Sequence, residues 1–281
     1  MDRKFKDAVI IITGGASGIG KELARQLLER GAEVIIIDRN ESSRAGILSE
    51  FQSDSSHITY IIADMADKQQ AANAFETILQ KHSKIDYVIN GAGVFLGGEI
   101  RDTPLESWHF ITQNNTFAVM NGTYYAYEAM RAQARGHIVN IGSAAGLMPI
   151  PAMGIYGSTK YAIGGLTQAL RNEAKECNVR VSLVCPTIVD TPLYDTATYH
   201  KVNKKRALER RASFQSVDVA AARIIRGIKK NKPVIHTSAS TQFISLIYRC
   251  SPTLYNLFAR IILKKIQGSV SSTIRLFFTL Y

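Results

Sequence analysis

VIIITGGASGIG, residues 9–20, joins a short β-branched apolar run to a glycine-rich turn, and an amphipathic helical pattern continues to residue 30. Glycines let the backbone of a turn approach a phosphate group closely, and the free N–H groups at a helix N-terminus attract negative charge. The spacing TGxxxGxG differs from the dinucleotide fingerprint GxGxxG but serves the same purpose. This stretch therefore predicts a strand, a turn and a helix that together bind a pyrophosphate.

The same alternation of strand and helix continues along the chain. The expected strands are apolar throughout, which is typical of a parallel sheet with both faces covered by helices. They span residues 8–12, 33–37, 57–62, 85–90, 137–141, 180–184 and 233–236, with helices over 18–30, 67–81, 104–131, 152–177 and 217–230. The order predicts an α/β fold with a Rossmann-like, doubly wound parallel sheet of about seven strands. We expect one domain over residues 1–237.

Residues 238–281 lack this alternation and are expected to form a helical C-terminal extension. Apolar residues recur at helical spacing over 254–266, with Arg260, Lys264 and Lys265 between them. The chain carries a net charge of +11, and residues 201–281 hold 16 basic and two acidic side chains. An amphipathic basic helix fits an anionic membrane surface, and the same apolar stripe fits a contact between subunits. The basic stretch 201–206 with Arg210 and Arg211 belongs either to this surface or to a solvated helix face.

Composition narrows the class of protein. With 281 residues, 46% hydrophobic and 20% charged, the chain can bury a full core and is neither disordered nor fibrous. The three cysteines form no CxxC pair, which favours a reducing compartment, and no apolar stretch approaches the roughly 18 residues of a spanning helix. We predict a cytoplasmic protein, with membrane association through the extension as the alternative. The six histidines show no metal spacing, and no recognition motif accompanies the basic charge, so neither a metal nor a nucleic acid is expected.

Two adjacent residues at the end of the second strand bear on the cofactor. Asp38 is placed to accept hydrogen bonds from ribose hydroxyls, which favours NAD and repels a 2′-phosphate. Arg39 points to NADP if it binds that phosphate, and to neither cofactor if it faces solvent. Asp64, after the third strand, either reaches the adenine or caps the following turn.

A tyrosine and a lysine carry the expected chemistry. Tyr156 and Lys160 are four residues apart on a helix and therefore share a face. A nearby ammonium favours the phenolate, which moves the phenol pKa from about 10 towards neutrality, where a general acid and base works best. Ser143 follows the fifth strand, at the sheet edge where ligands of such folds bind, and is placed to hydrogen-bond a substrate oxygen.

Taken with Asn115 and the run Asn90-Gly91-Ala92-Gly93, these motifs over about residues 5–237 resemble the short-chain dehydrogenase/reductase family. The resemblance implies that Lys160 also holds the nicotinamide ribose, that Asn115 holds a water in a proton relay, and that the protein forms dimers or tetramers. Two positions depart from the family pattern. Gly91 replaces a frequent asparagine, and Thr187 replaces the usual glycine after Pro186.

The resemblance and the motifs together give the candidate site. The catalytic residues are Ser143, Tyr156, Lys160 and Asn115. The expected cofactor-binding residues are Gly14, Ser17, Gly18, Ile19, Gly20, Asp38, Arg39, Asp64, Met65, Asn90, Gly91, Ala92, Tyr156, Lys160, Pro186, Ile188 and Thr191.

The expected substrate side is apolar. Besides Ser143 and Tyr156 it comprises Phe95, Met148, Met153 and Leu193, with Tyr194 on the covering loop. Because none of these side chains is charged, we expect a hydrophobic ketone or secondary alcohol, steroid-like or acyl-chain in type, converted by hydride transfer with Tyr156 as general acid and base. The alternative is a dinucleotide-sensing protein that docks to a membrane or partner without significant turnover. Such a protein is expected to lack part of the catalytic set, which this chain retains.

Overall fold

A computed structural model describes residues 4–51, 57–202, 204–205, 211–257 and 259. Its strands are β1 (Val9–Thr13), β2 (Glu33–Asp38), β3 (Ile58–Ile62), β4 (Tyr87–Asn90), β5 (Leu96–Gly98), β6 (Gly136–Ile141), β7 (Val179–Cys185), β8 (Thr198–His200) and β9 (Val234–His236). Its helices are α1 (Gly18–Leu28), α2 (Ser43–Glu50), α3 (Lys68–Lys81), α4 (Leu105–Thr112), α5 (Ala118–Ala132), α6 (Gly154–Glu173), α8 (Val217–Lys229) and α9 (Ala239–Cys250).

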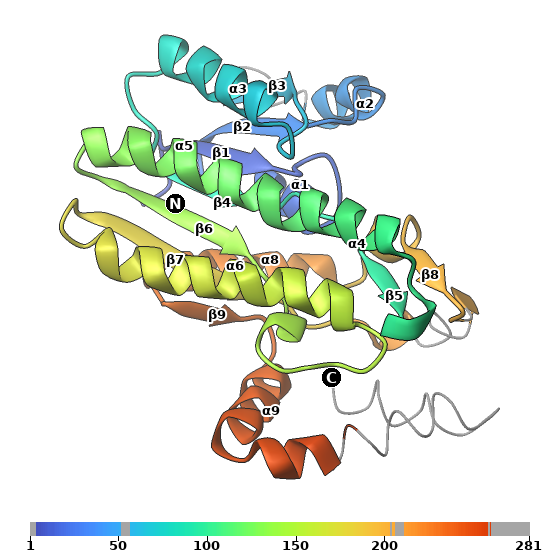
Figure 1. Ribbon diagram of the computed structural model, residues 1–281. Helices are drawn as coiled ribbons and strands as arrows, with labels where there is room; N and C mark the ends of the chain where they lie inside the picture. Colours follow the sequence, from blue (N-terminus) through green and yellow to red (C-terminus); the bar gives the residue numbers. More distant parts are fainter. Residues whose placement is uncertain (1–3, 52–56, 203, 206–210, 258, 260–281) are drawn as a thin grey trace.

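Seven of the strands form one parallel sheet in the order β3-β2-β1-β4-β6-β7-β9. Helices α3, α5 and α6 cover one face, and α1 and α8 cover the other (Figure 1). The chain winds outward from β1 in both directions, so the loops after β1 and β4 meet at the centre of the sheet. The predicted doubly wound Rossmann-like fold is confirmed, and each predicted strand lies within two residues of an observed one.

Both sheet faces are apolar because each strand sends alternate side chains into a different core. Ile10 and Ile12 of β1 pack towards α1 and α8, where they meet Leu27 and Ile224. Ile11 belongs to the core on the opposite face, beneath α3, α5 and α6. This two-sided burial fixes the sheet and holds its carboxyl-end loops in place.

The single helix expected over 104–131 is interrupted. Between α4 and α5 the chain forms a π-helical turn, Gln113–Phe117, with wider hydrogen-bond spacing than an α-helix. The buried side-chain amide of Asn115 explains the turn, because it bonds the backbone of Val94 twice: its Oδ1 accepts from the N–H at 2.7 Å and its Nδ2 donates to the carbonyl at 3.0 Å. These bonds tie the helix to the loop after β4.

Helix α2 and two short strands were not predicted from the sequence. Strands β5 and β8 pair in parallel as a separate two-stranded sheet, with Leu96 opposite Thr198 and Gly98 opposite His200. Each strand has three residues, too few for a recognisable alternation. Their pairing anchors the segment after β7 against the segment after β4.

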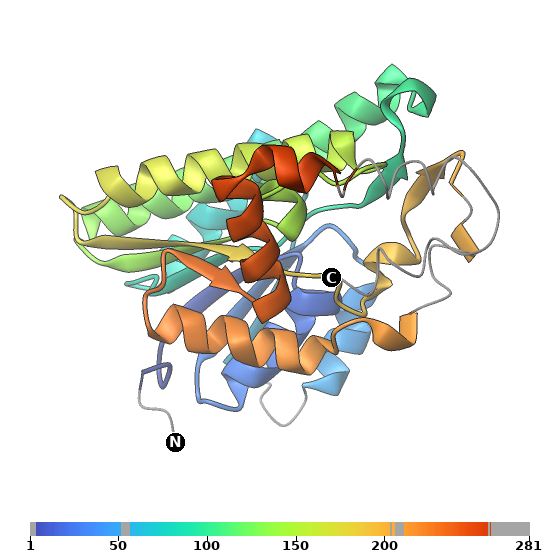
Figure 2. The ribbon, with the colours of Figure 1, turned by 90° about the horizontal axis from the view of Figure 1, so that it is seen from below.

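The C-terminal extension packs on the domain. Helix α9 crosses the outer side of β9, from the layer of α8 towards the layer of α6 (Figure 2). Residues 252–257 are also helical. Most of the helix predicted over 254–266 lies outside the described residues. In the part of the chain that the structure describes, no helix is both long and apolar enough to cross a membrane.

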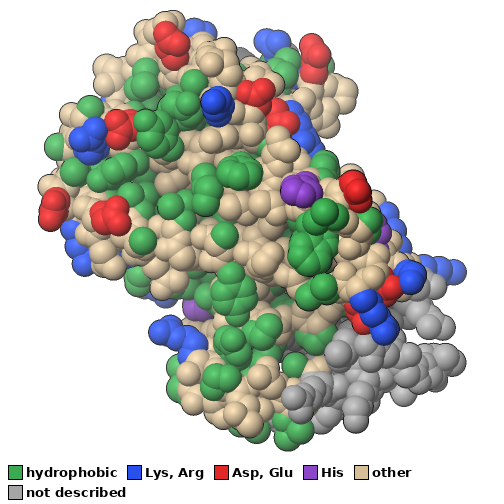
Figure 3. Space-filling model, viewed as in Figure 1, with side chains coloured by type: hydrophobic (Ala, Val, Ile, Leu, Met, Phe, Trp, Pro, Cys, Tyr) green, Lys and Arg blue, Asp and Glu red, His purple; other side chains and the backbone are tan. Residues whose placement is uncertain are grey.

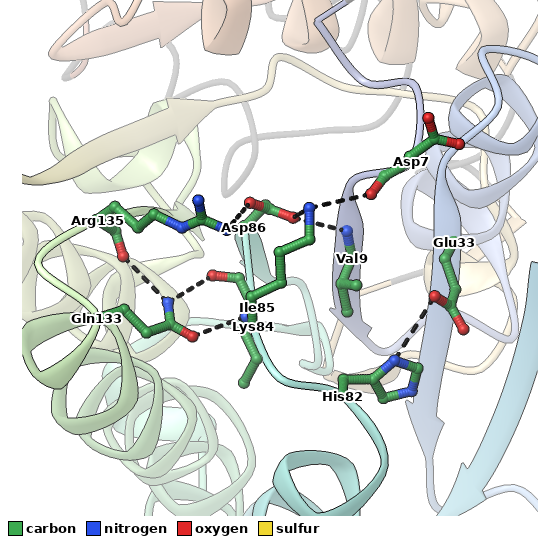
Figure 4. A network of polar contacts seen from close by, with 9 residues as sticks. All are labelled: Asp7, Val9, Glu33, His82, Lys84, Ile85, Asp86, Gln133 and Arg135. Atoms are coloured by element: carbon green, nitrogen blue, oxygen red, sulfur yellow. Dashed lines mark hydrogen bonds and ion pairs between the residues drawn. The ribbon is translucent and has the colours of Figure 1, made fainter.

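A polar network ties together the amino ends of the strands, at the edge opposite the carboxyl-end loops (Figure 4). The carboxylate of Asp86 accepts a hydrogen bond from the N–H of Val9 at 3.0 Å. It also forms an ion pair with Arg135 at 3.3 Å. The side-chain amide of Gln133 bonds both the N–H and the carbonyl of Ile85, at 2.8 and 3.0 Å. The starts of β1, β4 and β6 are therefore joined by side chains as well as by the sheet.

Candidate active site

A cavity of about 390 Å³ opens at the carboxyl ends of the central strands. The loops after β1, β2, β3, β4, β6 and β7 all contribute to its walls, as expected where the winding of such a sheet reverses. Of the residues predicted from the sequence, it is lined by Gly14, Ser17, Gly18, Ile19, Gly20, Asp38, Arg39, Asp64, Met65, Gly91, Ala92, Ser143, Tyr156, Lys160, Pro186, Thr191 and Leu193.

The glycine-rich turn needs its glycines. Gly14 has φ of +70°, and a Cβ there would lie 2.8 Å from the Cα of Ala92. Gly18, at the first position of α1, has φ of +51°. Thr13 joins the two loops, because its Oγ1 accepts from the N–H groups of Gly91 and Ala92 at 3.1 and 3.3 Å. Glycine at position 14 therefore lets the turn pack against the loop after β4, and glycine at both positions allows the positive φ.

Acidic and basic side chains meet at the far end of the cavity. The carboxylate of Asp38 accepts from the N–H groups of Ala16 at 3.1 Å and Asn40 at 3.0 Å. Arg39 donates to Oδ1 of Asn114 at 2.6 Å and lies 3.5 Å from the carboxylate of Asp64. Arg39 thus bridges two elements instead of pointing freely into solvent, and Asn114 lines the cavity although the sequence analysis did not include it.

Two of the predicted cofactor residues lie elsewhere. Asn90 is fully buried, and its Nδ2 donates to Oδ1 of Asn140 at 2.8 Å inside the fold. Ile188 lines a different cavity, next to Gln215 and Arg223. In both cases the neighbouring residue in the chain, Gly91 or Thr187, faces the candidate site instead.

Ser143, Tyr156 and Lys160 meet at the inner end of the cavity. Ser143 lies two residues after β6, and its hydroxyl accepts a hydrogen bond from the N–H of Ala145 at 3.1 Å. Tyr156 and Lys160 lie on one face of α6, with Nζ of Lys160 5.6 Å from the centroid of the Tyr156 ring. That ammonium donates to the carbonyl of Ile141 at 3.3 Å. The three side chains thus form one buried polar group.

Burial governs the protonation of this group. It raises the pKa of Tyr156 to about 12, an effect that the nearby Ser143 partly offsets. Burial also lowers the pKa of Lys160 to about 8. The sequence predicts the opposite direction for Tyr156, and that prediction is wrong for this structure. The ammonium of Lys160 lies over the ring and bonds a carbonyl, so desolvation of the phenolate outweighs its attraction.

Asn115 acts on the site through its neighbours. Its side chain is fully buried and bonds Val94 and, through Nδ2, Oγ1 of Thr159 at 3.2 Å. The side chain does not line the cavity. It holds the loop after β4 against α6, the helix that carries Tyr156 and Lys160.

The predicted substrate residues fall into two groups. Leu193 lines the cavity with Tyr194, and Phe95 packs behind them, its ring centroid 4.9 Å from that of Tyr156 and 5.3 Å from that of Tyr194. Met153 is partly buried in the same apolar cluster. Met148 is fully buried in a cluster with Tyr255 of the C-terminal extension, away from the cavity. The substrate wall is therefore more aromatic than the sequence predicts.

The loop that carries Leu193 and Tyr194 is held by ion pairs as well as by β8. Arg211 contacts the carboxylates of Asp190 at 2.5 Å and Asp195 at 2.6 Å, one on each side of the loop's 3-10 turn. Lys201 contacts Asp102 at 2.7 Å. Two residues of the basic stretch thus pair with acids, whereas Arg206 and Arg210 lie outside the described residues. No group of three histidine, cysteine or carboxylate side chains suited to a metal occurs among the residues described.

The sequence matches the short chain dehydrogenase family over residues 8–202. The chain belongs to the short-chain dehydrogenase/reductase family. It is an oxidoreductase with the dinucleotide-binding fold of that family. It is 30% identical over 208 residues to an uncharacterized oxidoreductase of Staphylococcus epidermidis, covering 73% of this chain and 87% of the relative. An uncharacterized oxidoreductase of Staphylococcus saprophyticus is 31% identical over 195 residues, or 68% of this chain and 82% of the relative.

Solved structures of short-chain dehydrogenase/reductases share the fold. The enzyme of Burkholderia phymatum in complex with NAD superposes with a TM-score of 0.82 at 24% identity, covering 89% of this chain and 96% of that one. The 3-ketoacyl-(acyl-carrier-protein) reductase of Brucella melitensis, complexed with NADH, gives 0.73 at 22% identity, covering 83% and 97%.

Proposed function

We propose that this short-chain dehydrogenase/reductase interconverts a hydrophobic ketone and its secondary alcohol with a nicotinamide dinucleotide, with Tyr156 as general acid and base. The observation that carries the proposal is that Ser143, Tyr156 and Lys160 line the same cavity as the glycine-rich turn. The expected nucleotide site and the expected proton donor thus lie in the same cavity.

The shape and chemistry of the cavity fit a dinucleotide. Gly14 and Gly18 line the cavity at the N-terminus of α1, where free N–H groups would bind a pyrophosphate. Asp38 would hold the adenosine ribose, and Lys160 the nicotinamide ribose. The nicotinamide supplies or accepts the hydride when it is bound.

The residues of the chain handle the proton. In the reductive direction the hydroxyl of Tyr156 donates its proton to the carbonyl oxygen, and in the oxidative direction it takes the proton back. Ser143 donates a hydrogen bond to the same oxygen and orients it. Because burial keeps Tyr156 protonated at neutral pH, the acid form is ready for carbonyl reduction. Lys160, with a pKa of about 8, can exchange a proton in the working range.

The lining of the substrate end favours an apolar carbonyl compound. Tyr194 and Leu193 line this end, and Phe95 and Tyr199 form a connected aromatic cluster behind them, next to Tyr156. Apart from Lys160, the charged side chains among the described lining residues are Asp38, Arg39 and Asp64, all at the nucleotide end. A steroid-like or acyl-chain carbonyl suits such a wall better than a sugar acid.

The same contacts favour NAD over NADP. Asp38 would repel a 2′-phosphate, and Arg39 is already paired with Asp64 and Asn114. To bind the phosphate of NADP, Arg39 would have to leave both partners. We therefore expect a lower Kd for NADH than for NADPH.

The test is the oxidation of NADH and NADPH with carbonyl compounds graded from short and polar to long-chain and steroid-like. We expect Tyr156→Phe to lose nearly all turnover while still binding NADH, because only the proton donor is removed. Tyr127→Phe is the matched control, since it removes a phenol hydroxyl of α5 that bonds only Cys177 among the described contacts, and it should keep the wild-type rate. A Tyr156→Phe variant with most of its rate would refute the assignment. Tight NADH binding without turnover on any carbonyl would favour the dinucleotide-sensing alternative.

We also propose that the protein forms a homo-oligomer through the face of α4, α5 and α6. Hydrophobic side chains gather on this side of the molecule (Figure 3). Phe117, Met120 and Tyr124 of the π-turn and α5, with Tyr161 of α6, are all exposed. Exposed apolar side chains grouped on one face in this way favour a protein contact. Sedimentation equilibrium of wild type and Tyr124→Asp tests it, and an unchanged mass would contradict it.

A further inference from the structure

Helix α9 packs Ile244 and Tyr248 against the domain but leaves other apolar side chains outward. Thr241 is fully buried and Ser245 is 6% exposed, whereas Phe243 is 64% and Leu246 55% exposed. An amphipathic helix on a globular domain normally packs its apolar stripe against the core. In α9 a second apolar stripe, with Phe243 and Leu246, faces solvent, which makes it a candidate contact surface.

The next helical segment is fixed in a way that leaves more apolar surface outside. Tyr255 is buried, its hydroxyl donates to the carbonyl of Pro149 at 2.6 Å, and its ring packs on Tyr248 at 5.1 Å between centroids. Leu254 and Leu257, on either side of it in sequence, are exposed. This segment is thus anchored by two tyrosines, while Leu254 and Leu257 remain in solvent.

Positive charge lies directly beside this apolar surface. A cavity of about 300 Å³ at the start of α9 is lined by Arg223, Arg226, Lys230 and Lys232, together with Ala239 and Gln242 of the helix. Among the described residues, no acidic side chain lines it. Ala239 and Gln242 of α9 line the cavity and lie one turn before Phe243 and Leu246, so the cationic cavity adjoins the apolar stripe.

Apolar and cationic groups side by side suit an anionic lipid surface. Lipid phosphates attract the cations, and the headgroup region accepts the apolar side chains. A second copy of the chain explains the apolar part less well, because a two-fold contact centred on α9 would bring two cationic cavities close together. Residues 201–281 hold 16 basic and two acidic side chains, and this positive charge also favours an anionic lipid surface.

We propose that α9 and residues 252–257 form a peripheral docking surface for bilayers that contain anionic phospholipid. Phe243 and Leu246 enter the headgroup region, and Arg226 and Lys230 neutralise lipid phosphates. The proposal goes beyond the oxidoreductase function and does not depend on it, since none of these residues lines the catalytic cavity.

The test is co-sedimentation of the full chain with vesicles of phosphatidylcholine, with and without phosphatidylserine, at low and high salt. We expect binding only to vesicles with phosphatidylserine, weakened by salt. Arg226→Gln with Lys230→Gln should weaken binding about fivefold for each charge removed. Phe243→Ser with Leu246→Ser should reduce binding at least as strongly. Leu79→Ser is the matched control, because it removes a comparably exposed leucine on α3, far from α9 in sequence and on another layer, and should bind as wild type does.

Several results would overturn the proposal. Failure of the wild type to sediment with phosphatidylserine vesicles excludes the surface as a lipid site. Unchanged binding of both double variants places any membrane contact elsewhere in the chain. A change from dimer to monomer in Phe243→Ser with Leu246→Ser, without vesicle binding by the wild type, assigns the stripe to a second copy. Circular dichroism of each variant shows that a loss of binding is not a loss of fold.

Discussion

Replacing Lys160 with methionine should change how stability depends on pH. Burial lowers the pKa of this lysine from its usual 10.5 to about 8, because the protein interior disfavours the ammonium. The unfolded chain therefore keeps the proton up to about pH 10.5, whereas the folded chain releases it near pH 8. Between these values the unfolded state binds more protons, so the free energy of unfolding rises with pH.

The size of the effect follows from the shift. A difference of roughly 2.5 pKa units corresponds to about 3 kcal/mol. Below pH 8 the wild type bears this burial penalty, so Lys160→Met should be the more stable protein, by up to about 3 kcal/mol less the roughly 1 kcal/mol of the hydrogen bond to Ile141. Near pH 10.5 the advantage should be gone.

Urea unfolding at a series of pH values from 7 to about 10.5 measures this difference. Other titrating groups, including Tyr156, are common to both proteins and cancel in the subtraction. Lys175→Met is the matched control, because Lys175 is exposed on the segment after α6, and its curve should run parallel to that of the wild type. Parallel curves for wild type and Lys160→Met would refute the claim that Lys160 is buried as a destabilised ammonium.

Three further predictions concern the site and its support. Gly20→Ala would place a Cβ against the carbonyl of Gly14, and we expect it to weaken NADH binding and to destabilise the fold by roughly 1–3 kcal/mol; fluorescence titration with wild-type affinity would contradict this. Asn115→Ala removes the partners of both backbone groups of Val94 and should cost roughly 2–4 kcal/mol in urea unfolding, so a loss below about 1 kcal/mol would argue against the role of these bonds. Burial lowers the pKa of His137 to about 3, so the unfolded chain takes up a proton first as pH falls from about 6.5, and stability should drop by up to about 5 kcal/mol towards pH 3. His137→Phe should lack that part of the acid sensitivity, and an unchanged acid transition would contradict the assignment.

The parts of the fold and site that follow from local spacing are predictable from the sequence. Alternate side chains of β1 face two cores, so its unbroken apolar run indicates a strand covered on both sides. Tyr156 and Lys160 lie four residues apart on a helix, which places them on one face whatever surrounds them. The glycine-rich turn depends on backbone conformations that favour glycine, so the positions of its glycines in the sequence predict it.

What depends on distant contacts is not predictable in this way. The π-turn exists because Asn115 bonds Val94, and no periodicity within residues 104–131 shows that partner. Met148 looks like a cleft residue until Tyr255, over one hundred positions later, packs on it. The pKa of Tyr156 depends on where the ammonium of Lys160 lies and how much water is excluded, neither of which follows from their spacing. Helix α9 is a further example. Its sequence pattern indicates a polar and an apolar face, but it does not tell which side chains pack against the domain.

The position of α9 across β9 has a consequence for association between chains. β9 is the last strand in the order of the sheet, and a bare edge strand offers N–H and carbonyl groups that can pair with any other extended chain. A helix laid across this edge obstructs the approach of a further strand. At this edge the chain therefore presents the side chains of α9 instead of the unpaired backbone of β9. An unpaired strand can bind almost any other strand, whereas binding through side chains can be changed by single substitutions.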